Sequence, residues 1–101
     1  MAKAYWIVRV DVSNPEGYQD YVAANGVAFA KYGARFLVRG GPYRVAEGEA
    51  RARNVVIEFP SYEAAEACWD SPEYQDAKAK REGHAVADVI IMSGYEGAQP
   101  G

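Results

Sequence analysis

The alternation of apolar and polar residues near the start of the chain constrains its fold most. The even-numbered residues from Trp6 to Val12 are all apolar, whereas Arg9 and Asp11 fall on odd positions. A period of two is typical of a β-strand that turns one side to a core. The sequence therefore predicts a strand over Ala4–Val12, and later segments must cover its apolar side.

A helix is expected directly after this strand. Asn14-Pro15-Glu16 supplies an N-cap, a proline at the first helical position and an acid near the positive helix end. One stripe then repeats at helical spacing, made by Tyr18, Tyr21, Val22, Asn25 and Phe29. Gly33 is the expected stop, because glycine adopts the left-handed conformation after a helix without strain.

The remaining elements complete a β-α-β-β-α-β order. Strands are expected at Arg35–Arg39, Asn54–Phe59 and Asp88–Ser93, and helical segments after Ser61 and after Pro72, the second ending at Gly83. This order is the split β-α-β, or ferredoxin-like, pattern: an α+β fold with a four-stranded antiparallel sheet and its helices on one face. We expect one domain over residues 1–95 and a flexible C-terminal tail over residues 96–101.

Strict alternation along the four strands predicts two unlike sheet faces. The nearly all-apolar face, expected beneath the helices, holds Trp6, Val8, Val10, Val12, Phe36, Val38, Val55, Ile57, Phe59, Val89 and Ile91. The mixed face holds Tyr5, Ile7, Arg9, Arg35, Leu37, Arg39, Val56, Glu58, Asp88, Ile90 and Met92. A face that stays in water does not need this many large apolar residues. We therefore expect a homodimer that pairs mainly through Ile7, Arg9, Leu37, Val56, Ile90 and Met92.

Charge and composition exclude several classes of function. The formal net charge is −3 and the 11 basic residues are scattered, so no basic surface is expected to bind nucleic acid. Arg9 and Asp11 interrupt the first apolar run too early for a signal peptide or a membrane span. A single cysteine cannot form an internal disulfide, so we expect a cytoplasmic protein.

Several runs of the chain resemble a known family. They are Tyr5–Ile7, Arg9–Asp11, Asn14–Glu16, Lys31–Gly33, Arg35–Gly41, Val56–Ser61 and Ser71–Tyr74. From about Ala4 to Tyr95, the chain resembles the domain-of-unknown-function family numbered thirteen-thirty, within the dimeric α/β-barrel superfamily. The resemblance implies a ferredoxin-like protomer whose sheet packs on a second sheet. The superfamily includes cofactor-free monooxygenases, muconolactone isomerases and haem-binding chlorite dismutases, and it assigns no catalytic residue here.

Few residues are candidates for chemistry. Arg39 and Glu58, expected on adjacent strands, would bind an anionic substrate or seal the dimer. Asn25 on an apolar stripe needs a partner, either a ligand or a backbone carbonyl, and Tyr18 and Tyr21 would line an aromatic cleft beside it or belong to the core. His84 is the only histidine, and it would be a general base, a haem ligand or an exposed loop residue. Cys68 is expected to be an inert core thiol.

Two main hypotheses of function follow. In the first, the chain binds or transforms a small aromatic or carboxylate-bearing molecule in a cleft between helix and sheet. In the second, it is a non-catalytic dimeric module whose aromatic residues are all structural. Haem binding through His84 is a third alternative. No metal site is expected, because one histidine and scattered carboxylates offer no ligand spacing, and no cofactor is expected.

Overall fold

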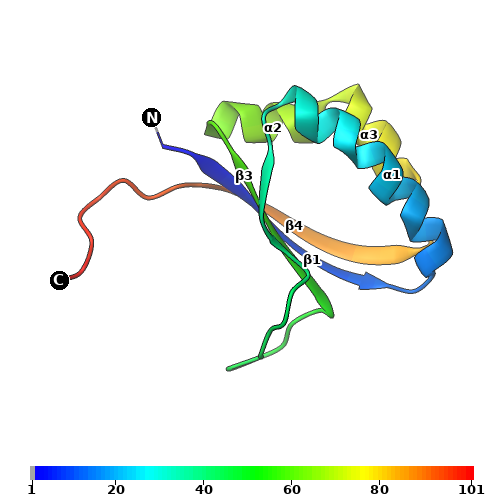
Figure 1. The fold of residues 1–101 in the computed structure, drawn as a ribbon, viewed down its shortest axis with the longest axis horizontal. Helices are drawn as coiled ribbons and strands as arrows, with labels where there is room; N and C mark the ends of the chain where they lie inside the picture. Colours follow the sequence, from blue (N-terminus) through cyan, green and yellow to red (C-terminus); the bar gives the residue numbers. More distant parts are fainter. Residues whose placement is uncertain (1) are drawn as a thin grey trace.

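The computed structural model contains one sheet of four antiparallel strands in the order β2-β3-β1-β4. It describes residues 2–101. The elements are β1 (Ala4–Val12), α1 (Pro15–Lys31), β2 (Arg35–Arg39), β3 (Arg53–Phe59), α2 (Tyr62–Asp70), α3 (Pro72–Ala79) and β4 (Ala85–Ser93). The helices lie on one face of the sheet and leave the other uncovered (Figure 1). The ferredoxin-like α+β architecture is confirmed.

Side-chain caps set the helix boundaries. The Asn14 side chain accepts a hydrogen bond from the backbone N–H of Gly17 at the start of α1. The Ser61 hydroxyl accepts one from Ala64 at the start of α2, at 3.0 Å. Ser71 separates α2 from α3: its hydroxyl donates to the carbonyl of Cys68 at 2.7 Å and accepts from the N–H of Tyr74 at 3.1 Å. One serine therefore ends one helix and begins the next.

Aromatic side chains form the centre of the core, between the helices and the sheet. Trp6 is 1% exposed, and its ring centroid lies 4.9–5.7 Å from those of Phe29, Phe59, Trp69 and Tyr74. Its indole N–H donates to the carbonyl of Ala65 at 3.0 Å. Such a cluster contributes burial together with edge-to-face contacts, and it fixes α1, α2 and α3 on β1 and β3.

A β-bulge in β2 overturns part of the predicted face assignment. Phe36 pairs with Ile57 as alternation requires, but Val38 pairs with Val56 and Arg39 with Val55. One extra residue is therefore inserted after Phe36, and Leu37 and Val38 together oppose Val56. Val38 lies on the uncovered face, and Arg39 lies on the covered face. Both residues were predicted on the opposite sides.

The connection between β2 and β3, residues 40–52, extends away from the sheet (Figure 1). Arg51 fastens its end to the uncovered face, where the guanidinium donates to Asp11 at 2.8 Å and to Asp88 at 2.7 Å. The Asp11 carboxylate also accepts from the backbone N–H of Ala52 at 2.9 Å. The connection is thus extended and has one anchored end, and β3 begins at Arg53, one residue earlier than expected.

Candidate functional site

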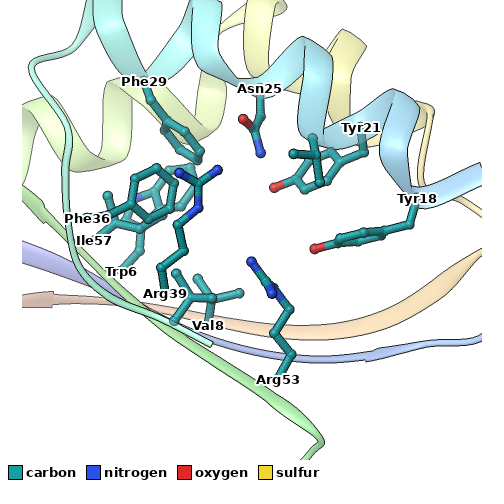
Figure 2. A pocket seen from close by; sticks show the side chains of 12 residues that line it. Trp6, Val8, Tyr18, Tyr21, Asn25, Phe29, Phe36, Arg39, Arg53 and Ile57 are labelled. Atoms are coloured by element: carbon teal, nitrogen blue, oxygen red, sulfur yellow. The ribbon is translucent and has the colours of Figure 1, made fainter. Parts of the chain in front are cut away.

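A cleft lies between α1 and the covered face of the sheet (Figure 2). Its walls come from α1, β1, β2 and β3: Trp6, Val8, Tyr18, Tyr21, Val22, Asn25, Phe29, Phe36, Arg39, Arg53, Val55 and Ile57. The inner part is small, about 30 Å³, close to the volume of one water molecule in the liquid. A larger open hollow of about 270 Å³ shares Tyr18, Val22 and Arg53 with it and continues towards Val12 and Pro15. The inner cavity and the outer hollow together form the candidate site.

Regular spacing of side chains on α1 and on β3 forms two walls of this site. On α1, side chains three and four residues apart share one face, which turns Tyr18, Tyr21 and Asn25 to the sheet. On β3, Val55 and Arg53 continue the covered side of the strand, and Arg53 lies opposite the buried Val10 of β1. The cleft therefore has one aromatic wall from α1. Its other wall comes from the sheet and ends at the guanidinium of Arg53.

Two arginines stand at the mouth of the cleft. The Arg39 guanidinium lies 4.2 Å from the centre of the Phe36 ring, and Arg53 points towards the Tyr18 hydroxyl (Figure 2). Within residues 2–101, neither guanidinium forms an ion pair with a carboxylate. Gly40 has φ +70°, and a Cβ there would lie 2.8 Å from Nη1 of Arg53. Glycine at this turn thus leaves room for the Arg53 side chain.

Buried tyrosines and an amide line the inner cavity. The hydroxyls of Tyr21 and Tyr74 lie 2.8 Å apart, and Asn25 is 7% exposed beside Tyr21. Burial raises the pKa of Tyr21, and its contact with Tyr74 raises it further, while Arg81 and Asn25 act in the opposite direction. Burial also raises the pKa of Tyr18. Both phenols stay protonated at neutral pH and can donate hydrogen bonds.

Four of the predicted ligand-binding residues meet in the cleft: Tyr18, Tyr21, Asn25 and Arg39. Glu58 does not join them. It lies on the uncovered face, opposite Tyr5, and its nearest cationic partner is Lys3 at 3.4 Å. The predicted pair of Arg39 with Glu58 is wrong, because the bulge moves Arg39 to the other side of the sheet.

His84 lies outside the cleft. Its Nδ1 is 3.1 Å from Nδ2 of Asn14, and its carbonyl accepts hydrogen bonds from the N–H groups of Ser13 and Asn14. Its ring also packs so tightly on α1 that a Cβ at Gly17 would come within 2.5 Å of it. The histidine therefore fastens the start of α1 to the segment before β4, and this geometry does not favour the haem alternative.

Sequence reasoning missed three polar residues of this region. Arg53 falls one position before the predicted start of β3, although the period of Phe59, Ile57 and Val55 would have reached it. Arg81 is 9% exposed and Tyr74 is 1% exposed, both beneath α1. No sequence pattern marks these last two residues as neighbours of Tyr21, because only the packing of α3 on α1 brings them together.

Nucleophilic and metal chemistry find little support elsewhere in the fold. Burial, with a smaller effect of Glu73, raises the pKa of the Cys68 thiol to about 12, so this cysteine is neutral at physiological pH. Within the described part of the chain, no group of three or more His, Cys, Asp or Glu side chains could hold a metal ion. The cleft instead combines two cations, an amide, phenolic donors and aromatic walls. Guanidinium groups in such a set have the geometry to bind a planar anion.

Solved structures with the same fold come from several bacteria. The RPA0582 protein of unknown function from Rhodopseudomonas palustris has a TM-score of 0.73 at 19% identity, covering 95% of this chain and 85% of its own. SnoaB, a cofactor-independent oxygenase from Streptomyces nogalater, has a TM-score of 0.62 at 10% identity, covering 96% and 97%. Rv0793 from Mycobacterium tuberculosis has a TM-score of 0.53 at 16% identity, covering 96% and 99%. At these identities the likeness concerns the fold alone.

The sequence itself is similar to one family. No curated protein matches the chain in sequence. None of the helices in residues 2–101 is both long enough and apolar enough to span a membrane. The family profile described as Domain of unknown function (DUF1330) matches residues 3–95. The chain therefore belongs to the DUF1330 family.

Proposed function

We propose that this protein binds a small organic molecule with an aromatic ring and a carboxylate in the cleft between α1 and the sheet. The observation that carries the proposal is the pair of guanidinium groups, Arg39 and Arg53, at the mouth of a cleft whose other walls are aromatic and aliphatic apart from Asn25. A guanidinium can bind a carboxylate through two parallel hydrogen bonds. The outer hollow beside Tyr18 and Val22 offers about 270 Å³ for the ring.

The aromatic walls favour a flat ligand over a flexible aliphatic acid. Tyr18 forms part of both the inner cavity and the outer hollow, and Phe36 already stacks against the guanidinium of Arg39. An aromatic ring gains from such surfaces both by burial and by edge or stacking contacts. SnoaB, which shares the fold, is a cofactor-independent oxygenase. The proposal concerns binding alone, and a reaction of the bound molecule would not contradict it.

Calorimetric titration with 2-naphthoate and 2-naphthamide tests the proposal. We expect the acid to bind at least about tenfold more tightly than its neutral amide, because hydrogen bonds to a charged group are the stronger ones. Arg39→Ala and Arg53→Ala should each weaken the acid about tenfold. Arg35→Ala is the matched control, because Arg35 is exposed on β2 opposite Glu58. Equal binding of acid and amide, or equal losses in all three variants, would contradict the proposal.

We also infer that a second copy of the chain covers the uncovered face of the sheet. This face exposes Leu37, Val38, Val86, Ile90 and Met92, each between 46% and 58%. It carries both signs of charge, since Arg9 lies opposite Asp88 and Arg35 opposite Glu58. A two-fold interface repeats the same patch on both partners, and a patch with both charges can pair with itself. Light scattering at micromolar concentration should therefore give the mass of a dimer.

A further inference from the structure

The inner cavity and the outer hollow differ in size, and the difference limits what each can hold. The inner cavity, about 30 Å³, is too small for an aromatic ring but has room for one water molecule or one oxygen substituent. Tyr21 and Asn25 supply polar groups to its wall from α1. A ligand whose ring lies in the outer hollow can therefore place only a small group there.

Behind this cavity, three polar side chains from α1, α3 and the segment after α3 lie close together. The hydroxyl of Tyr21 lies 2.8 Å from that of Tyr74. The Arg81 guanidinium is centred 5.2 Å from the Tyr21 ring. Arg81 is 9% exposed, and within residues 2–101 it forms no ion pair with a carboxylate. A buried cation without a carboxylate is costly, and the cation–π contact with Tyr21 offsets part of that cost.

The two phenols share one hydrogen bond, for which either oxygen can supply the hydrogen. A hydroxyl has one hydrogen and two acceptor positions. In either direction of this bond, the Tyr21 oxygen therefore keeps a position for a partner in the inner cavity, and the bond with Tyr74 fixes where that position lies.

We propose that the inner cavity is a subsite for an oxygen substituent on the ring of the ligand, bound by Tyr21 and Asn25, and that Tyr74 is a positioning residue that orients the Tyr21 hydroxyl. The inference rests on the proposed function and narrows its ligand to aromatic acids with a second oxygen, a hydroxyl or a carbonyl. Tyr21 and the Asn25 amide can each donate a hydrogen bond to this oxygen or accept one from it.

Binding of 6-hydroxy-2-naphthoate and 2-naphthoate, which differ by one hydroxyl, tests the subsite. We expect the hydroxy acid to bind about tenfold more tightly to the unaltered protein. Tyr21→Phe should abolish this difference, and Tyr74→Phe should reduce it to about threefold. Tyr62→Phe is the matched control, because Tyr62 is a partly exposed tyrosine at the start of α2. Affinity for 2-naphthoate should fall less than affinity for the hydroxy acid in Tyr21→Phe and Tyr74→Phe and should be unchanged in Tyr62→Phe, which separates loss of the subsite from loss of the fold.

The outcomes separate the two proposals. If both acids bind equally to the unaltered protein, or the tenfold difference survives in Tyr21→Phe, the subsite is wrong and the proposed function stands. If the full difference survives in Tyr74→Phe, Tyr74 does not orient the Tyr21 hydroxyl. If neither acid binds, both proposals are wrong.

Discussion

The two faces of the sheet are built from the same strands yet differ in almost every physical respect. Trp6 on the covered face is 1% exposed, whereas Ile90 on the uncovered face is 56% exposed, although β1 and β4 are adjacent. Polar groups on the covered face gather in one cleft, while those on the uncovered face form surface ion pairs such as Arg51 with Asp11 and Asp88. The helices make this difference, because they enclose one face only (Figure 1).

The residues that stabilise this fold and those that form the candidate site lie in different places. The aromatic cluster around Trp6 excludes water and joins all three helices to the sheet. The cleft lies at the border of this cluster, where the side chains change from Phe29 and Ile57 to Arg39 and Arg53. The uncovered face has apolar area but no comparable partner within the chain. Mutations on the two faces should therefore have separable effects.

The largest effect is expected from Trp6→Ala. The substitution leaves a cavity among four aromatic rings and removes the hydrogen bond to the Ala65 carbonyl, so the free energy of unfolding should fall by about 3–5 kcal/mol. Urea denaturation followed by circular dichroism measures this change. Trp69→Ala is the control, because Trp69 is only partly buried on α2 and should cost less. Equal losses would show that Trp6 is not the centre of the core.

The second-largest effect is expected from a substitution on the uncovered face that leaves the core intact. Ile90→Lys places a charge opposite Ile7 on this face, so the proposed dimer should dissociate about a hundredfold more readily. Size-exclusion chromatography with light scattering at micromolar concentration measures the mass. Val27→Lys is the matched control, because Val27 is 65% exposed on α1, on the helical side of the molecule. A monomeric unaltered protein, or a dimeric Ile90→Lys variant, would contradict the proposed interface.

Regular patterns made most of the fold predictable from sequence. The alternation from Trp6 to Val12 indicated β1 with its correct bounds, and the caps at Asn14 and Ser61 marked the starts of two helices. These signals are local, because a strand period or a cap depends on residues within a few positions. The element order then allowed few topologies, and the ferredoxin-like arrangement is the one observed.

The candidate site was predictable only in part, since it depends on irregularity and on distant contacts. A strict period of two cannot foresee an extra residue in β2, so Arg39 was predicted on the wrong face and paired with Glu58. Asn25 was detectable as an amide on an apolar stripe of α1. Tyr74 and Arg81 reach Tyr21 only through the packing of α3 on α1, which no local pattern encodes.

The smallest effect should come from the ion pairs of the uncovered face, which are exposed and screened by salt. Hydrogen bonds from the N–H of Ala52 and from Arg51 hold the pKa of Asp11 below its usual range. Asp11 binds its proton less readily in the folded state than in the unfolded state. Its contribution to stability is therefore present above the ordinary aspartate pKa of about 4 and is lost as the pH falls through the lower, folded value.

Arg51→Gln should raise the pKa of Asp11 only part of the way, because the hydrogen bond from Ala52 is expected to remain. Titration of the Asp11 carboxyl by carbon-detected NMR, at low and at high salt, measures the change. Arg44→Gln is the matched control, because Arg44 is exposed in the same β2–β3 connection. An Asp11 pKa that is unchanged in Arg51→Gln, or that moves equally in both variants, would mean that Arg51 does not anchor this connection. Of the hydrogen bonds to Asp11, only the one from Ala52 would then hold the connection to the face where a second copy is expected to pack.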